Sequence, residues 1–310
     1  MKKSHKNPVS KEILIDQDLE SFYYNYDPRK LSRKIILKMV KCMHMFMEGT
    51  FVILGLYGRG YQNALDLQVD HKEICLPNLP TIFENMKILL LSDFHLGTIK
   101  ELPAIIINKI KNLEIDLCLL GGDYRHCATN PTHPFLEDLE EIVSSIRPSL
   151  GVYGVLGNHD GLEIIPALER MGIKMLINNS VRIKKGVQYI NLIGIDEFNV
   201  FRRHDLEIAF QNVSSTDFNI FLSHSPDLFK KAESHGSDLY LCGHTHHGQI
   251  QFPIIGPIVT FTSAPRKLAI GSWQYKKMAG YTSPGLGTVA ASVRFRCPPM
   301  ATVLTLKGNS

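Results

Sequence analysis

Residues 86–95 read MKILLLSDFH, a short apolar run that ends in two polar residues, Asp93 and His95. Similar runs follow, DLCLLGGD at 116–123 and VYGVLGNHD at 152–160. Segments with helical periodicity separate the runs, over 103–113, 134–146 and 164–172. Short apolar runs that alternate with helical segments predict an α/β fold whose strands end in polar motifs.

The second half of the chain is richer in predicted strands, and two of these also end in polar motifs. NIFLSHSP at 219–226 contains His224, and DLYLCGHTH at 238–246 ends in His244 and His246. Further strands are expected at 175–183, 189–196 and 301–307. Side chains at the carboxyl ends of successive strands converge in one crevice of an open α/β sheet. The motifs therefore predict a single site.

The side chains at these strand ends are imidazoles, carboxylates and an amide, with no thiolate. Such a nitrogen and oxygen donor set suits Mn²⁺, Fe or Zn²⁺ and argues against a structural cysteine-type zinc site. Asp123 has two carboxylate oxygens and can bridge two ions. Two ions roughly 3.5–4 Å apart can clamp the attacking and leaving oxygens of an in-line displacement. Each motif alone would be interpreted as a turn, but their common order at strand ends predicts a two-metal site.

The series DFH…GGD…GNHD…H…GHTH resembles the signature of the calcineurin-like metallophosphoesterase superfamily, over residues 86–307. The resemblance implies a four-layer α/β/β/α sandwich with two mixed sheets. It implies one metal held by Asp93, His95, Asp123 and His246, and a second held by Asp123, Asn158, His224 and His244. Mn²⁺ is the favoured ion, with Fe or Zn²⁺ as alternatives.

The same resemblance makes His159 the general acid that protonates the leaving oxygen, and not a metal ligand. A polyanionic substrate beside its imidazole would raise the pKa of His159 and favour this role. Arg125 and His126 follow the bridging Asp123, and we interpret them as substrate-phosphate contacts or as a solvated turn.

Longer stretches are similar to one branch of the superfamily, that of bacterial membrane-associated phosphoesterases. They include LIGIDEF, GHTHHGQIQFPIIGP and the tail SVRFRCPPMATVLTL. The branch contains the chlamydial-type UDP-2,3-diacylglucosamine pyrophosphatase of lipid A biosynthesis, which implies a lipid-linked nucleotide as substrate, with UMP and lipid X as products. Two residues depart from the pattern: His247 stands where Gly is usual, and Met300 where an acidic residue is usual.

Two other functions stay open at this point. One is a general metal-dependent phosphodiesterase or phosphatase with a soluble phosphate-containing substrate. The other is a non-catalytic scaffold on the same fold. Scaffolds of this kind typically lose metal ligands or the acid histidine, whereas this sequence retains all of them.

Positive charge is concentrated near the N-terminus. The net charge is +4, and residues 1–41 contain ten Lys and Arg against five acidic residues. Residues 29–48 have a helical pattern with four lysines on one face, and the apolar run GTFVILGLYG follows at 49–58. We predict that residues 1–58 form a basic amphipathic segment that either lies in a membrane interface or packs on a catalytic domain at 86–307.

The apolar run at 49–58 is too short to span a bilayer, which needs about 20 residues. The basic amphipathic segment and the apolar run that follows it favour an anionic membrane surface over nucleic acid as the partner. The expected location is the bacterial cytoplasm, at the inner face of the inner membrane. Six cysteines without a CxxC pair are expected to be reduced, which agrees with that compartment.

Overall fold

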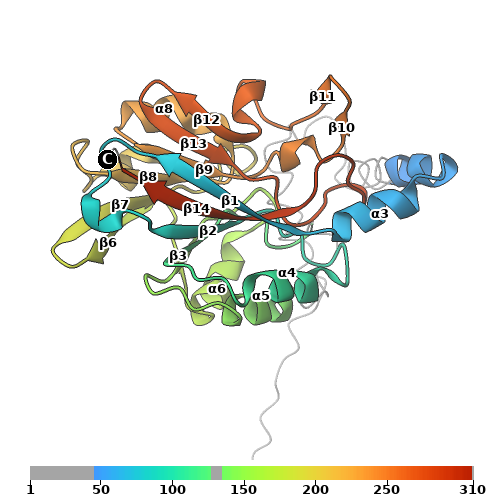
Figure 1. The fold of residues 1–310 in the computed structure, drawn as a ribbon, viewed down its shortest axis with the longest axis horizontal. Coiled ribbons are helices and arrows are strands. Elements are labelled where there is room, and N and C mark those ends of the chain that lie inside the picture. The colour runs from blue at the N-terminus through green and yellow to red at the C-terminus, as the bar shows by residue number, and fades with distance from the viewer. Residues whose placement is uncertain (1–44, 127–134, 309–310) are drawn as a thin grey trace, which may run out of the picture.

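The computed structural model describes residues 45–126 and 135–308. Two sheets of six strands each pack face to face, with helices on their outer faces (Figure 1). This arrangement is the α/β sandwich with two mixed sheets that the family resemblance implies. The fold class is confirmed.

The first sheet has the order β1-β14-β2-β3-β4-β5. Neighbours from β2 to β5 are parallel, β14 is antiparallel to β2, and β1 is parallel to β14. The strands are β1 (Gln68–Cys75), β2 (Lys87–Leu91), β3 (Leu117–Leu120), β4 (Val152–Gly154), β5 (Ile173–Met175) and β14 (Met300–Lys307).

The second sheet has the order β12-β13-β9-β8-β7-β6, with parallel inner strands and antiparallel edge strands. A separate short hairpin, β10 (Gln251–Phe252) and β11 (Gly256–Pro257), lies outside both sheets. The sheet strands are β6 (Asn179–Lys185), β7 (Gln188–Gly194), β8 (Asn219–Leu222), β9 (Leu239–Cys242), β12 (Gly271–Tyr275) and β13 (Met278–Thr282).

The helices that connect the strands are short. They are α3 (Tyr57–Leu65), α4 (Leu102–Ile110), α5 (Phe135–Ser144), α6 (Ile165–Arg170), α7 (Leu206–Phe210) and α8 (Phe229–Ser234), with 3-10 turns η1 (Thr81–Phe83), η2 (Leu162–Ile164), η3 (Pro226–Leu228), η4 (His246–Gly248) and η5 (Arg266–Leu268).

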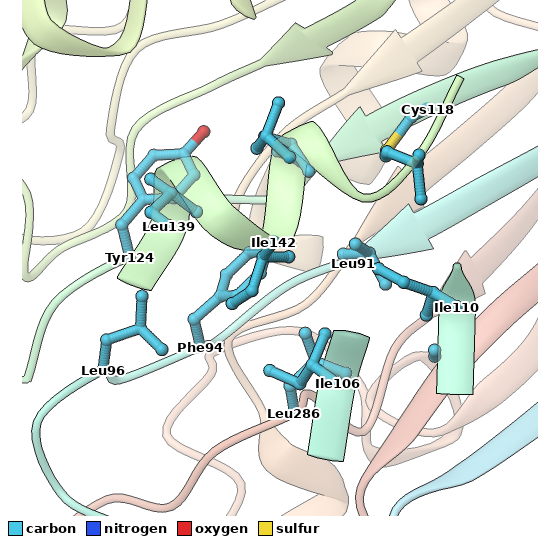
Figure 2. Packing of buried hydrophobic residues seen from close by; sticks show 14 of the residues in the cluster. Leu91, Phe94, Leu96, Ile106, Ile110, Cys118, Tyr124, Leu139, Ile142 and Leu286 are labelled. Carbon is cyan, nitrogen blue, oxygen red and sulfur yellow. The ribbon is translucent and has the colours of Figure 1, made fainter. Parts of the chain in front are cut away.

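Strand β2 explains why the apolar runs are continuous and not alternating. Ile88 and Leu90 pack in the core between the two sheets, while Leu89 and Leu91 pack in the core beneath the helices. A strand that is buried on both faces needs apolar residues at every position. Figure 2 shows Leu91 with Ile106 and Ile110 of α4, which lie four residues apart and so share one helix face.

Strands β1, β12 and β13 are additions to the elements that the sequence predicts. β1 contains Asp70, His71, Lys72 and Glu73 and is mostly exposed on the sheet edge, so it lacks an apolar strand pattern. Its pairing with β14 places residues N-terminal to 86 within the first sheet. The folded body therefore begins before the predicted boundary at residue 86.

Part of the predicted N-terminal segment contacts this body. Residues 45–53 are helical, and the Phe51 ring stacks on the Phe295 ring with centroids 5.5 Å apart. The basic face that includes Lys30 and Lys41 lies outside the described residues. Among the described residues, none of the helices is long and apolar enough to cross a membrane.

Four of the six cysteines lie in the described residues, and all four are free. Cys118 in β3 and Cys242 in β9 are buried within apolar strands, as the sequence predicts. The other two, Cys42 and Cys127, lie outside the described residues.

Candidate metal centre

The strand ends of both sheets deliver the seven predicted metal ligands to one region. Asp93 and His95 follow β2, Asp123 follows β3 and Asn158 follows β4. His224 follows β8, and His244 and His246 follow β9. Six of the seven are buried and His244 is half-buried. This end of the molecule also carries α3, β10 and β11, on the right in Figure 1.

One group of potential ligands consists of Asp93, His95 and His246, whose donor atoms lie within 4.8 Å of one another. The Nε2 atoms of His95 and His246 are 3.0 Å apart, and His246 Nε2 is 3.6 Å from Asp93 Oδ1. Two imidazole nitrogens and a carboxylate oxygen that converge in this way fit a divalent cation.

A second group consists of Asp123, His224 and His244. His224 Nε2 is 3.3 Å from Asp123 Oδ2, 3.0 Å from Asn158 Oδ1 and 3.1 Å from His244 Nδ1. Asp123 Oδ2 is also 3.6 Å from His95 Nε2, which belongs to the first group. Asp123 therefore lies between the two groups, where a bridging carboxylate would lie.

The hydrogen bonds of the ring nitrogens that face away from the centre also fit metal binding. His224 Nδ1 donates to the Gly121 carbonyl at 2.7 Å, and His244 Nε2 donates to the Phe261 carbonyl at 2.8 Å. A ligating histidine usually donates its other ring N–H to a carbonyl or carboxylate, which fixes the tautomer. These bonds leave His224 Nε2 and His244 Nδ1 as the ligand atoms. The residues present thus fit two divalent cations.

The charges of this centre are those of a buried ion pair. Burial would raise the pKa of Asp123, but the imidazoles of His224 and His159 outweigh it and hold the pKa well below its usual range. Burial would lower the pKa of His224, but Asp123 raises it to about 10. A metal can bind His224 only after that proton leaves, so metal binding and proton release are linked.

Asp93 is held by short polar contacts. Ser92 Oγ donates to Asp93 Oδ2 at 2.7 Å, and the His244 backbone N–H donates to both carboxylate oxygens at 3.0 Å. Gly285, with φ +74°, packs against this carboxylate, and a Cβ there would lie 2.7 Å from Asp93 Cβ. Glycine at 285 therefore lets the loop after β13 close over the aspartate.

Asp160, the last residue of GNHD, is an anchor that the sequence analysis left without a role. Its buried carboxylate accepts N–H donors from the Asp123 backbone at 2.7 Å, from Gly157 at 2.9 Å and from Tyr124 at 3.1 Å. Burial and the nearby charge of Asp123 raise the pKa of Asp160 to about 7. One side chain thus joins the loop of Asp123 to the loop of Asn158. The sequence offers one signal for this role, because Asp160 lies inside the GNHD motif.

Five of the seven predicted ligands have a left-handed backbone, with φ between +43° and +70°: Asp93, His95, Asp123, His244 and His246. This conformation costs roughly 1–3 kcal/mol for a residue other than glycine. Strained residues persist only where surrounding contacts determine them, and such residues concentrate at functional sites. The anchors on Asp93 and Asp123 are contacts of this kind.

The predicted acid, His159, lies at the edge of the centre. Its Nε2 is 3.9 Å from Asp123 Oδ2, and its backbone N–H donates to Asp123 Oδ1 at 2.8 Å. Burial lowers the pKa of His159 and Asp123 only partly opposes this shift. The cationic imidazole expected from the sequence therefore requires the added charge of a bound phosphate. His95, Asp123 and His159 form a third group of convergent donors, so distances alone also allow His159 as a ligand.

Arg125 and His126 lie beside the centre. Arg125 Nε donates to the His159 carbonyl at 2.8 Å, and its Nη2 pairs with Glu163 at 2.8 Å. These contacts brace the loop of His159, while substrate binding by Arg125 stays a prediction. The His126 ring lies near the His95 ring, with centroids 6.2 Å apart, and lines a cavity of about 280 Å³ together with Glu48 and Thr288.

His247, which departs from the resembled pattern, is buried against β13 and the start of β12. Its φ of +49° explains why glycine is usual at this position. The buried ring lies 2.7 Å from the Thr282 carbonyl, and burial lowers the pKa of His247 to about 4. A neutral, buried imidazole thus supports β13.

Arg294 is a second residue that the sequence analysis missed. Its side chain is fully buried, donates to the Gly287 carbonyl at 2.6 Å and lies 3.3 Å from His246 Nδ1. It fastens the loop after β13 behind a predicted ligand. An arginine in a loop sequence gives no signal of burial, since most arginines are exposed.

Comparison with known proteins agrees with this geometry. Residues 86–248 match the sequence model of the calcineurin-like phosphoesterase family. The chain is 28% identical to the uncharacterised metallophosphoesterase YkoQ of Bacillus subtilis, over 78% of this chain and 91% of that protein. It is 28% identical to YkuE of the same organism, over 91% of this chain and 100% of that protein. It is also 28% identical to the phosphodiesterase YaeI of Escherichia coli, over 71% of this chain and 82% of that protein.

Proposed function

The chain belongs to the calcineurin-like phosphoesterase family, and from this premise we propose that it hydrolyses phosphate esters or anhydrides at a two-metal centre. The family consists of metal-dependent phosphoric ester hydrolases. The observation that carries the proposal is the position of Asp123 Oδ2, 3.6 Å from His95 Nε2 and 3.3 Å from His224 Nε2. A carboxylate between two groups of convergent donors is the arrangement that a two-metal hydrolase needs.

We assign the residues to the two ions as the resemblance implies. The first ion would be held by Asp93, His95, Asp123 and His246, and the second by Asp123, Asn158, His224 and His244. The donor atoms are nitrogen and oxygen, which suits Mn²⁺, with Fe or Zn²⁺ as alternatives. When bound, the two ions supply Lewis acidity toward the phosphate and activate the attacking water.

The protein side chains perform the proton transfer and the positioning. His159 Nε2 would carry the proton that passes to the leaving oxygen, and a substrate phosphate beside it would favour the protonated imidazole. Arg125 holds the His159 carbonyl, and the His159 backbone N–H is held by Asp123 Oδ1. The backbone of the proposed acid is thus bonded to the proposed bridging carboxylate, which would help to position the two side chains relative to each other.

The finer proposal concerns the substrate. The resemblance to the branch with UDP-2,3-diacylglucosamine pyrophosphatase supports a lipid-linked nucleotide, cleaved to UMP and lipid X at the inner face of a bacterial membrane. A soluble phosphodiester is the second candidate, and the similarity to a protein named phosphodiesterase favours it.

One experiment separates these functions. The full chain would be treated with a chelator, reloaded with Mn²⁺, Zn²⁺ or Fe²⁺ in turn, and assayed on a diacylated UDP-sugar, a cyclic nucleotide and an aryl phosphodiester. We expect turnover only after reloading, highest with Mn²⁺ and with the diacylated UDP-sugar. Faster cleavage of the soluble diesters would make the chain a general phosphodiesterase. Full turnover after exhaustive chelation would exclude the two-metal centre, and metal binding without turnover on any substrate would indicate a scaffold.

A further inference from the structure

Large apolar side chains are exposed in an uneven way. Among the described residues, sixteen large hydrophobic side chains are exposed, and twelve of them lie in two short stretches. One stretch is residues 45–56, and the other is residues 252–261, which include the β10–β11 hairpin. Scattered exposed apolar residues are normal, but a concentration of this kind marks an interaction site. The exposed residues are Met45, Phe46, Val52, Ile53, Leu54, Leu56, Phe252, Ile254, Ile255, Ile258, Val259 and Phe261.

The two stretches lie on the same part of the molecule because Phe295 contacts one of them and the residue directly before the other. The Phe295 ring stacks on Phe51 of the first stretch, and the Gln251 N–H donates to the Phe295 carbonyl at 2.9 Å, at the start of the hairpin. Both stretches lie at the right-hand end in Figure 1, the end to which β2 and β3 point. We call residues 45–56 and 252–261 together the apolar face.

The apolar face adjoins the metal centre. The Phe261 carbonyl accepts a hydrogen bond from the predicted ligand His244 at 2.8 Å. On the other side, Glu48 of the first stretch lines the cavity of about 280 Å³ that His126 also lines. A molecule that lies against the apolar face therefore has a short path to the proposed phosphate-binding residues.

The charges around the apolar face indicate the kind of surface that it fits. Residues 251–265 are uncharged, and positive residues border the face: Arg59 in α3, Arg266 and Lys267 in η5, and Arg296 beside Phe295. One acidic side chain, Glu48, lies within the face and another, Asp227, lies beside it. Asp227 is bonded to the Ser263 N–H and hydroxyl, and Glu48 lines the cavity. An apolar surface with a cationic border fits an anionic lipid interface, where the apolar side chains enter and the cations meet the head groups.

The shape of the face also favours a bilayer over a protein groove. Ile254, at the tip of the hairpin, is fully exposed, and its neighbours Ile255 and Ile258 are both mainly exposed. Arg266 braces this tip because its guanidinium donates to the Ile255 carbonyl at 2.6 Å and also to the Pro257 carbonyl. A braced, protruding apolar tip can enter a fluid interface without a matching cavity.

We propose that the apolar face docks on an anionic lipid bilayer and holds the metal centre at the membrane surface. The inference rests on the membrane location within the proposed function, and it adds the surface that makes the contact. Docking can be measured without substrate, so its failure is distinguishable from a failure of the proposed hydrolysis.

The test uses the full chain and flotation with vesicles of phosphatidylcholine, with and without phosphatidylglycerol. The variants are Ile254→Asp in the hairpin and Ile53→Gln in the first stretch, and Val187→Asp is the matched control. Val187 is also fully exposed, but it lies in the turn between β6 and β7 at the opposite end of the molecule (Figure 1). Ile254 has φ +68°, a conformation that Asp tolerates better than Ile, so this substitution should not weaken the fold.

We expect the wild-type chain and Val187→Asp to float with phosphatidylglycerol vesicles, and to float less without phosphatidylglycerol or in high salt. Each face variant should bind about tenfold more weakly, since one buried apolar side chain is worth at least this factor. Thermal unfolding midpoints would verify that the variants are folded. Equal binding by Ile254→Asp, Ile53→Gln and the control would overturn the proposal and assign membrane binding to the basic N-terminal segment. Loss of a dimer in sedimentation velocity, with vesicle binding unchanged, would instead assign the face to a second copy of the chain.

Discussion

Replacement of Asp160 should loosen the centre without removing a ligand. In Asp160→Asn the amide oxygen can keep the N–H donors of Asp123 and Gly157, but the amide NH₂ then faces the Tyr124 N–H. The Tyr124 N–H loses its 3.1 Å acceptor and faces another buried donor, which costs at least about 1–3 kcal/mol. Asp160→Ala strips the acceptor from three N–H groups and should cost roughly 3–6 kcal/mol, since water can replace part of the loss.

The assay is urea unfolding in the presence of a chelator, together with metal stoichiometry at a fixed free Mn²⁺ concentration. Asp160→Asn should lower the unfolding midpoint and weaken metal binding, because the loops of Asp123 and Asn158 are no longer joined. Asp116→Asn is the matched control, since Asp116 accepts one backbone N–H, that of Lys87 at 2.8 Å, away from the site. The Asn oxygen can keep this one bond, so Asp116→Asn should change stability by no more than about 0.5 kcal/mol and leave metal binding unchanged. An Asp160→Asn protein with wild-type stability and two tightly bound ions would refute the anchoring role.

Four further outcomes follow from the centre and its surroundings. Asp123→Ala should lose both ions, because the Asp123 carboxylate contacts both groups of donors, whereas Asp93→Ala should lose one ion. Elemental analysis would measure the metal content of each variant, and equal losses would contradict the bridging assignment. His159→Ala should keep its metal and lower kcat roughly 10²–10⁴-fold, less for an aryl leaving group that needs no proton, and loss of metal would make His159 a ligand. The pKa of His224 is raised to about 10, so metal uptake at pH 7 displaces a proton and metal affinity should rise about tenfold per pH unit. Calorimetry in two buffers of different ionisation enthalpy should therefore give different binding heats. Equal heats in the two buffers would contradict the release of a proton. Burial would raise the pKa of Asp227, but hydrogen bonds from Ser263 outweigh burial and lower the pKa. The ionised Asp227 carboxylate should therefore stabilise the fold above about pH 4, and this contribution should be lost as the pH falls below that value. Asp227→Asn should destabilise the protein at pH 7 but hardly at pH 2–3.

The residues alone predict the α/β class and the gathering of polar motifs at strand ends, for a local reason, whereas the four-layer sandwich and the seven-ligand set follow from the family resemblance. A strand buried on both faces must be apolar throughout, and a polar motif directly after it must lie at the strand end, as Asp93 does after β2. These two rules use only neighbouring residues. They therefore needed no knowledge of the pairing between strands.

Features that depend on distant contacts could not be predicted in this way. β1 is polar because it lies at a sheet edge, so only its pairing with β14 reveals it as a strand. Arg294 is buried because carbonyls such as that of Gly287 surround it. The apolar run at 252–261 would ordinarily be assigned to the core, and its exposure is a property of the folded surface.

The strand order of the first sheet has a consequence for biosynthesis. β14 lies between β1 and β2, so Met300 pairs with Gln68 and Leu304 with Ile88. During synthesis, β1 therefore waits without a neighbour until β14 leaves the ribosome, and β2 exposes one edge for the same time. Because unpaired strand edges promote aggregation, the strand order extends the time during which the nascent chain is exposed to this risk. The second sheet contains no strand from so late in the chain and can assemble earlier.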